Sequence, residues 1–217
     1  MSKHQKPKIQ KSLERQEKAR KILNKFSNAI ENVCFDDSFS KTVDILINLA
    51  KKNCGKVVCT GMGKAGIIMH KFSATLSSLG ISSVFMHPGE ALHGDLGIVQ
   101  PNDVLFVAST SGKTREVLDI IYLSKKRNVK NIIGITSHID SPIRNIVDIV
   151  IDMGSVEEAG LLKLTPTTST IVMLSILDAL ALVVSDEIGF TAEDYSVLHH
   201  SGYLGEVLKQ ITNTIKN

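Results

Sequence analysis

Four hydroxyl side chains surround one glycine in the segment Ser109-Thr110-Ser111-Gly112-Lys113-Thr114. The segment follows a short apolar run and opens a helical pattern, so its hydroxyls and backbone N–H groups meet the positive end of a helix dipole. A Walker A nucleotide loop needs another glycine five positions before Gly112, and the sequence has Val107 there. One hydroxyl suffices to cap a helix. Four together favour a cradle for a phosphate monoester.

Hydroxyls also crowd the start of a long apolar helical pattern, in Thr165-Pro166-Thr167-Thr168-Ser169-Thr170. The N-terminus of that helix offers the same kind of N–H groups and the same dipole. We therefore expect Thr167, Thr168 and Ser169 to contribute to binding the same anion.

A glycine fingerprint, G-x-G-x-x-G, occurs in Gly61-Met62-Gly63-Lys64-Ala65-Gly66. A nicotinamide site also needs an acidic residue at the end of the second strand, about 20 residues on. That strand ends instead in Val84-Phe85-Met86-His87-Pro88, and Glu90 stands beyond it. The glycines alone fit a tight turn between a strand and a helix, with Lys64 as a cation in the crevice. Dinucleotide binding stays the rival hypothesis.

Side chains that can carry protons gather in a few segments. They are His87, Glu90, His93, Asp95, Glu116, Glu157, Glu158, His199 and His200. An aldose–ketose isomerase needs a base to move a proton between C2 and C1, an acid to open the sugar ring, and a group that stabilises the enediolate. A metal site is the alternative for histidines near carboxylates. The sequence has no HxH or HExxH spacing, so we predict neither a metal nor a cofactor.

Short apolar runs alternate with helical segments through the middle of the chain, which is typical of a parallel sheet covered on both faces. The strands are expected at 56–60, 82–86, 103–109, 131–136 and 148–152, and the helices at 12–31, 37–52, 64–79, 114–127, 141–146 and 166–188, with a last short helix after 205. This pattern predicts a doubly wound, flavodoxin-like α/β domain. Ligands of such sheets bind at the carboxyl ends of the strands, in the loops that start at 61, 87, 109, 137 and 153.

Composition places this domain among soluble proteins, because apolar residues make up 43% and charged residues 22% of the 217. No apolar run approaches the length of a membrane span, and the N-terminus lacks the apolar core of a secretion signal. The three cysteines, Cys34, Cys54 and Cys59, are expected to be reduced thiols. We therefore expect a cytoplasmic protein without a membrane partner.

Charge is distributed unevenly along the chain. Residues 1–25 hold nine Lys or Arg and two Glu, a net +7, so the remainder carries −4 of the total of +3. A solvated basic segment is the simpler interpretation, and docking of a partner is the other. With an acidic body and no reader module, nucleic acid is not expected as the main partner.

At this point the motifs resemble a known family, the sugar isomerase (SIS) domain of arabinose-5-phosphate isomerases. The resemblance covers about residues 40–208 and is carried by GMGKAG, HPGEALHGDLGIVQPNDV, STSGKTREV, LTPTTST, DALA and GFTAEDYSVLHHSGYLG. It implies metal-independent interconversion of D-ribulose 5-phosphate and D-arabinose 5-phosphate for the synthesis of 3-deoxy-D-manno-octulosonate and lipopolysaccharide. It also implies a three-layer α/β/α sandwich around a five-stranded parallel sheet, and a homotetramer whose sites are shared between subunits.

The resemblance further implies roles for single residues. The family's catalytic residues fall on Lys64, Glu116, Glu158, His199 and His93, and its phosphate loop falls on Ser109, Ser111 and Thr114. The glycine turn and the two hydroxyl clusters add Gly63, Thr110, Thr167, Thr168 and Ser169 as expected substrate- and phosphate-binding residues. Lys64 would stabilise negative charge, His199 and Glu158 would share ring opening and proton transfer, and Glu116 and His93 would orient the substrate or the histidine. Which group is the C2 base stays open.

This chain departs from the family pattern at two motifs. Lys113 stands where many members have glutamate, and Leu198-His199-His200-Ser201-Gly202 replaces Ser-His-Pro-Gly-Gly. The roles of Lys113 and His200 are not assigned. The paired CBS domains that usually follow the sugar isomerase domain are expected to be absent. We expect a basic N-terminal segment and helix over residues 1–36 and one SIS domain over 37–217.

Two other functions stay open at this stage. One is isomerisation of another phosphosugar, such as a 3-hexulose 6-phosphate. The other is a non-catalytic regulator that senses a phosphosugar, which would keep the phosphate loop but would not need the proton carriers.

Overall fold

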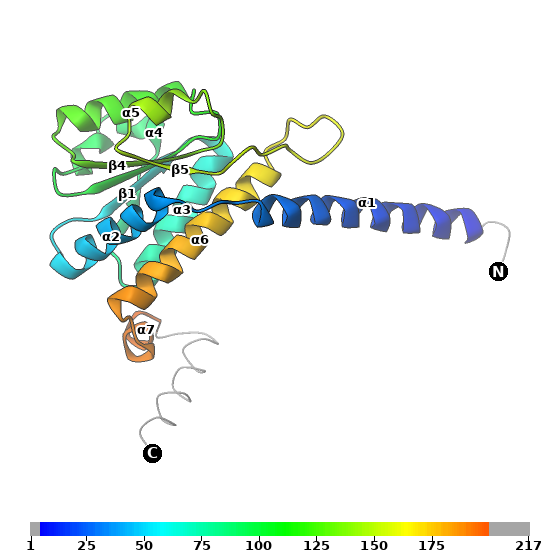
Figure 1. Cartoon of the computed structure of the whole chain (residues 1–217), viewed down its shortest axis with the longest axis horizontal. Coiled ribbons are helices and arrows are strands. Elements are labelled where there is room, and N and C mark those ends of the chain that lie inside the picture. The colour runs from blue at the N-terminus through cyan, green and yellow to red at the C-terminus, as the bar shows by residue number, and fades with distance from the viewer. Residues whose placement is uncertain (1–4, 200–217) are drawn as a thin grey trace, which may run out of the picture.

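The chain folds around a five-stranded parallel sheet with the strand order β2-β1-β3-β4-β5 (Figure 1). The computed structural model describes residues 5–199. The strands are β1 (Val57–Gly61), β2 (Ser83–Phe85), β3 (Val104–Ala108), β4 (Asn131–Thr136) and β5 (Ile149–Asp152). This is the flavodoxin-like order, so the predicted doubly wound α/β sheet is confirmed.

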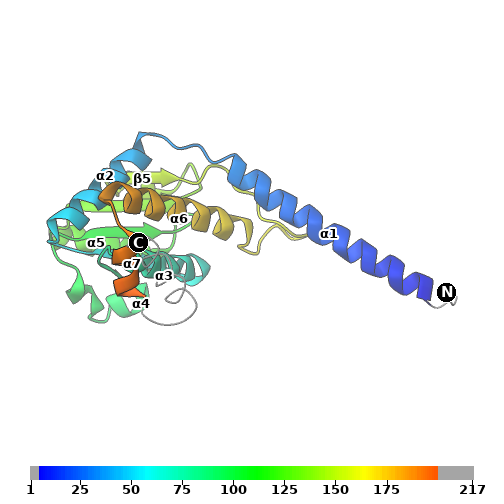
Figure 2. The same cartoon turned by 90° about the horizontal axis from the view of Figure 1, so that it is seen from below.

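Helices cover both faces of the sheet and complete a three-layer sandwich (Figures 1 and 2). The helices described are α1 (Gln5–Glu31), α2 (Asp37–Lys52), α3 (Gly63–Ser78), α4 (Pro88–Ala91), α5 (Arg115–Lys126), α6 (Thr168–Ile188) and α7 (Ala192–Leu198), with 3-10 turns η1 (Asp95–Ile98) and η2 (Pro142–Asn145). One apolar core joins α2, α3 and α6 to the sheet. A second core joins α4, α5 and η2 to the opposite face.

Strands β1 and β3 are largely apolar because their residues pack alternately against the two cores. In β1, Val57 and Cys59 enter the core under α2, α3 and α6, whereas Val58 enters the core under α5. All residues of β1 and β3 are buried. A strand buried on both faces does not alternate polar and apolar residues. Its sequence is therefore a nearly continuous apolar run.

One buried ion pair fixes the start of two neighbouring strands. The carboxylate of Asp103, 1% exposed, accepts hydrogen bonds from the Lys56 backbone N–H at 3.0 Å and from Lys56 Nζ at 2.7 Å. It also accepts one from the Gln100 backbone N–H at 2.8 Å. Three donors compensate the cost of burying this charge. The pair lies at the amino ends of β1 and β3, opposite the carboxyl ends of the strands.

The longest core helix, α6, is apolar enough by length and composition to cross a membrane, the one helix within residues 5–199 that meets this test. It packs against α1, α2 and α3, and 56% of its most apolar stretch is buried inside the protein. The central helix of a folded core needs the same composition. Packing within the sandwich therefore accounts for its hydropathy.

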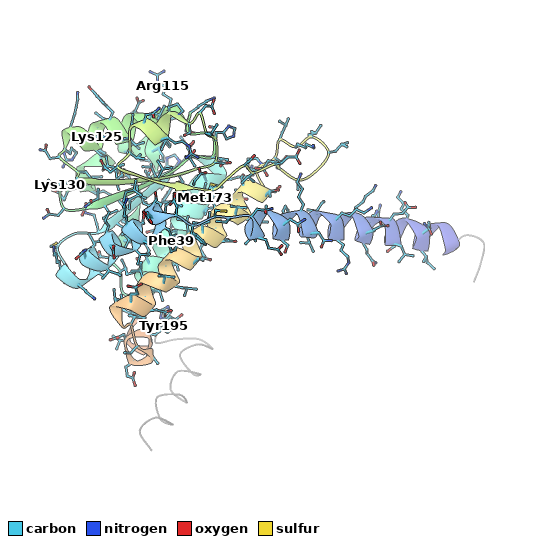
Figure 3. All side chains as sticks on the ribbon, in the orientation of Figure 1. Phe39, Arg115, Lys125, Lys130, Met173 and Tyr195 are labelled. Atoms are coloured by element: carbon cyan, nitrogen blue, oxygen red, sulfur yellow. The ribbon has the colours of Figure 1, made fainter. Side chains whose placement is uncertain are left out.

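The first helix, α1, extends away from the rest of the structure (Figures 1 and 2). Its side chains stand clear of the other elements along most of its length (Figure 3). Contact with the body begins at Lys25 and continues at Ala29, which packs against the core. The exposed stretch includes Leu13 and Leu23, which are 54% and 62% exposed.

Several predicted boundaries were wrong. Helix α1 begins at Gln5 instead of residue 12, and α6 begins at Thr168 instead of Pro166, which precedes its N-cap Thr167. The predicted helix 141–146 is only the 3-10 turn η2. Helix α4, turn η1 and helix α7 were not predicted; α7 is stabilised by a capping box between Thr191 and Asp194. The last helix expected after residue 205 lies outside the described residues.

Candidate functional site

A cavity of about 600 Å³ opens at the carboxyl ends of the strands, beside the start of α6. Four segments line it: Met62, Lys64 and Ala65 after β1; Ser109, Thr110, Ser111 and Thr114 after β3; His138 after β4; and Ser155, Val156, Glu157, Glu158, Lys163, Leu164, Pro166, Ser169 and Thr170 from the loop before α6 into its first turn. The position agrees with the rule that ligands of doubly wound sheets bind where the strands end.

The hydroxyl segment after β3 folds into a tight turn. Gly112 N–H donates to Ser109 Oγ at 3.1 Å, and Ser109 Oγ lies 2.9 Å from Thr114 Oγ1. Gly112 has a φ of +66°, and a β-carbon there would lie 1.6 Å from Ser141 Oγ. Only glycine fits this position. Thr114, the N-cap of α5, makes no side-chain capping bond, which leaves N–H groups of the helix start for an anion.

Lys113, unexplained by the sequence, ties this turn to the loop after β4. Its Nζ lies 2.9 Å from Asp140 Oδ2, and its hydrogen bond lowers the pKa of the Asp140 carboxyl. The same two loops are joined where Ser137 N–H donates to the Thr110 carbonyl at 3.0 Å. The turn Ser109–Thr114 is therefore tied to the loop that follows β4, the neighbouring strand.

Glu158 caps the N-terminus of α6 with its own carboxylate. Glu158 Oε2 accepts from the backbone N–H groups of Thr167 and Thr168, both at 2.8 Å, and Ser169 Oγ donates to Oε1. Burial alone would raise the pKa of Glu158, but these hydrogen bonds outweigh it and lower that pKa. The helix dipole adds to the stabilisation of the charge. Near neutral pH the site thus contains an ionised carboxylate.

This cap bears on the predicted second phosphate cluster. In the structure, the anion at Thr167, Thr168 and Ser169 is the carboxylate of the protein itself. Thr168 is fully buried and its Oγ1 accepts from Ala159 N–H at 2.9 Å. Of the three predicted residues only Ser169 lines the cavity.

Two lysines approach the cavity from opposite loops. Lys64 lies in the first turn of α3 and lines the cavity, and its side chain forms no ion pair with the residues that the structure describes. Lys163 lies in the loop before α6, and its Nζ is 2.5 Å from Glu157 Oε1. These ammonium groups supply positive charge inside a mildly acidic body.

The glycine fingerprint has a packing explanation. A β-carbon on Gly66 would lie 2.3 Å from the Gly61 carbonyl oxygen, so α3 can approach β1 only through glycine. Gly63 has a φ of +60° at the start of α3. It lies next to Lys64 but does not line the cavity. The tight-turn interpretation thus explains Gly63 and Gly66 by geometry.

Three predicted catalytic residues lie outside this cavity within one chain. Glu116 is half-buried in the first turn of α5, and His93 is exposed between α4 and η1. His199 ends α7, where its ring stacks on Tyr195 with centroids 3.9 Å apart, beyond the far end of α6 (Figure 3). A helix of 21 residues spans about 30 Å. The roles of these residues stay predictions, and His200 lies outside the described residues.

Sequence reasoning missed several residues that line the cavity. They are Met62, Ala65, His138, Ser155, Val156, Lys163, Leu164 and Pro166. Most of them follow β4 or β5, and the strand-end rule had selected those loops without singling out these side chains. Within residues 5–199, no group of three or more His, Cys, Asp or Glu is arranged to hold a metal ion.

Comparison with known proteins shows which family has this architecture. The SIS domain matches residues 49–183. The arabinose 5-phosphate isomerase KdsD of Pseudomonas aeruginosa is 41% identical over 79% of this chain and 51% of its own length. The chain thus spans about half the length of the curated relatives it matches.

Two solved structures agree with this match. A candidate phosphosugar isomerase involved in capsule formation in Bacteroides fragilis superposes with a TM-score of 0.83 and 41% identity over 86% of this chain and 98% of that one. An Escherichia coli CFT073 protein in complex with arabinose 5-phosphate has a TM-score of 0.76 and 32% identity over 92% of this chain and 100% of that one. The chain belongs to the SIS domain family.

Proposed function

We propose that this protein is an aldose–ketose isomerase that interconverts D-ribulose 5-phosphate and D-arabinose 5-phosphate. The observation that carries the proposal is one cavity lined by the hydroxyl-rich turn Ser109–Thr114, the lysine Lys64 and the ionised carboxylate of Glu158. Similarity to arabinose 5-phosphate isomerases, and to a protein solved with arabinose 5-phosphate bound, supports this substrate over other phosphosugars.

The proposed mechanism divides the work among the segments that line the cavity. The turn Ser109–Thr114 holds the phosphate with hydroxyls and N–H groups at the start of α5. Glu158, ionised at neutral pH, removes the proton from C2 of the aldose or from C1 of the ketose. Lys64 stabilises the enediolate oxygen that results. The proton returns to the neighbouring carbon while the hydroxyl proton passes between O2 and O1, so the isomerisation needs no external oxidant or reductant.

We propose that the assembled enzyme is a homotetramer, with His199 supplied to each cavity by another subunit. Within one chain Glu158 caps the start of α6, which spans about 30 Å, and His199 lies beyond its other end. In this arrangement His199 opens the sugar ring, and His93 and Glu116 orient the substrate or the histidine.

Complementation tests the shared site. Lys64→Met and His199→Ala variants are each expected to be inactive, and mixing them after reversible dissociation should restore activity at sites that take Lys64 from one subunit and His199 from the other. Mixed assemblies without activity contradict the shared site.

Incubation with D-ribulose 5-phosphate in deuterated water tests the reaction. We expect D-arabinose 5-phosphate with deuterium at C2, detected by NMR, and the same rate in EDTA. Phosphosugar binding without turnover would instead indicate a regulator. Loss of activity in EDTA would contradict metal independence.

Replacement of Glu158 by glutamine tests the base. Loss of general-base catalysis is expected to lower kcat by about 10²- to 10⁴-fold. Near-normal turnover with undiminished exchange of the C2 proton would exclude Glu158 from this role.

The proposed setting of the reaction is the cytoplasm, where its product would feed synthesis of 3-deoxy-D-manno-octulosonate and lipopolysaccharide. The resemblance of the motifs to arabinose-5-phosphate isomerases supports this setting. Rescue of a bacterium that lacks its own arabinose 5-phosphate isomerases, scored as growth without added D-arabinose 5-phosphate, tests it.

A further inference from the structure

Lys163 combines an unusual backbone with a place at the cavity. It lines the cavity from the loop before α6, and its φ is +52°. The left-handed region is costly for a residue with a β-carbon, and such residues concentrate at functional sites. The side chain is 60% exposed. Burial in a core therefore does not account for this conformation.

The ammonium of Lys163 belongs to a chain of three charges. Glu157 Oε1 lies 2.5 Å from Lys163 Nζ, and Glu157 Oε2 lies 2.5 Å from Lys25 Nζ on α1. Lys25 Nζ also donates to the Glu158 carbonyl at 3.1 Å. Hydrogen bonds from Lys163 and Lys25 lower the pKa of Glu157 to about 2. The triad Lys25–Glu157–Lys163 therefore carries a net charge of +1 at neutral pH.

The triad is expected to contribute little to the stability of the fold. All three side chains are at least one third exposed, with 34% for Lys25, 56% for Glu157 and 60% for Lys163. Ion pairs with this exposure contribute little to the free energy of folding. A net positive charge at the mouth of a cavity in an acidic body does affect binding of an anion. The arrangement is therefore better suited to attracting a ligand than to holding the loop.

We propose that Lys163 is a second cation for the phosphate-bearing ligand, which it reaches by leaving Glu157. Lys25 continues to neutralise Glu157 after Lys163 has moved, so the carboxylate does not repel the incoming dianion. Lys25 is thus a positioning residue that acts through Glu157. The identity of the ligand as a phosphosugar rests on the proposed function, whereas the binding of phosphate does not.

Three substitutions separate this electrostatic role from a structural one. Lys163→Met and Lys25→Met each remove one positive charge, and each is expected to raise KM about three- to tenfold with kcat unchanged. Glu157→Gln removes the negative charge and releases Lys163, so KM should stay level or fall. If the triad only held the loop in place, Glu157→Gln would weaken binding as much as either lysine variant.

Two further variants serve as controls. Lys163→Arg keeps the charge and should keep KM within about twofold of the parent protein. Lys130→Met removes an exposed charge at the opposite end of the sheet from the loop before α6 and should change neither KM nor kcat (Figure 3). Thermal unfolding of each variant verifies that the fold is retained.

The experiment combines kinetics with D-ribulose 5-phosphate and calorimetric titration with inorganic phosphate, each at low and high ionic strength. We expect Lys163→Met to raise KM for D-ribulose 5-phosphate and to weaken the affinity for inorganic phosphate. Both differences from the parent protein should shrink at high ionic strength. Absence of turnover in the parent protein would overturn the proposed function and leave the phosphate titration as the test of Lys163. Phosphate affinity of Lys163→Met within about twofold of the parent, or equal losses in Lys163→Met and Glu157→Gln, would overturn the role of Lys163.

Discussion

At Glu158 the protein places its own negative charge where the sequence suggested that a ligand's charge would sit. The sequence predicted that Thr167–Ser169 would bind the phosphate of a ligand, whereas in the structure their N–H and hydroxyl groups bind the carboxylate of Glu158. The carboxylate comes from nine residues before Thr167, through a loop whose path depends on the completed fold. The hydroxyl-rich turn after β3, by contrast, could be predicted from a local pattern, and four of its residues line the cavity.

Acid is expected to weaken the fold through this cap. The pKa of Glu158 is lowered from its ordinary value of 4.5, so its contribution to stability is complete above that value and is lost as pH falls through the lower, folded-state pKa. Because glutamine does not titrate, Glu158→Gln should reduce the loss of unfolding free energy as pH falls (the acid limb of the stability curve). The substitution should also lower the free energy of unfolding by about 1 kcal/mol at neutral pH.

Urea unfolding of both proteins, at a series of pH values from neutral into the acid range, measures the effect. Glu157 and Asp140 also have lowered pKa values, but they are present in both proteins and cancel in the difference. Identical acid limbs would show that Glu158 does not stabilise the start of α6.

Adding a single methyl group at Gly112 should displace the turn Ser109–Thr114. The β-carbon of Gly112→Ala would collide with Ser141, and the φ of +66° disfavours alanine in addition. A displaced turn is expected to lower kcat/KM about 100-fold, as small misplacements of a substrate do. Gly189→Ala is the matched control, because Gly189 has a φ of +75° with open space around it. It should lose some stability and keep its activity.

At the scale of the elements, the predicted strands and most of the predicted helix ends agree with the observed ones to within two residues. The exceptions are the start of α1, which lies seven residues earlier than predicted, and the predicted helix 141–146, which is the 3-10 turn η2. Strand positions follow from apolar runs, since both faces of the sheet are buried. Helix starts depend on caps: Thr167 follows Pro166 and stops α6 from beginning at the proline. The two histidines expected at the site, His93 and His199, follow α4 and α7, short helices whose apolar pattern is too brief to be recognised from sequence.

The sheet is expected to depend on Asp103. Asp103→Asn keeps the size of the side chain but removes the charge that accepts three hydrogen bonds from Lys56 and Gln100. Breaking this buried pair should lower the free energy of unfolding by about 2–4 kcal/mol. Turnover per folded molecule should not change, because the pair lies at the amino ends of the strands and the cavity lies at their carboxyl ends.

An exposed ion pair supplies the comparison for that measurement. Lys71 and Asp178 join α3 to α6 at 2.5 Å, with side chains 47% and 34% exposed. Asp178→Asn should cost less than about 1 kcal/mol. Equal losses of unfolding free energy in the two variants, measured by urea unfolding, would mean that the burial of Asp103 does not account for the contribution of its ion pair to stability.

At the scale of the whole molecule, removal of residues 1–20 should leave catalysis intact. The described residues of this stretch from Ile9 onward are exposed, and the deletion retains Lys25 and its contact with Glu157. We expect kcat/KM within about twofold of the full chain. A deletion that also removes Lys25 should raise KM as Lys25→Met does. Loss of kcat in the shorter deletion would contradict the solvated interpretation of the basic segment.

If active sites are shared between subunits as proposed, activity should depend on protein concentration. On the proposed arrangement no folded subunit contains a whole active site, so the rate law includes the association constant of the subunits. Specific activity should therefore fall on dilution while circular dichroism stays native, and substrate should oppose the fall because it binds only assembled sites. Constant specific activity at dilutions where sedimentation detects monomers would contradict this. A cell would then control the enzyme by a threshold of expression, below which folded protein accumulates without turnover.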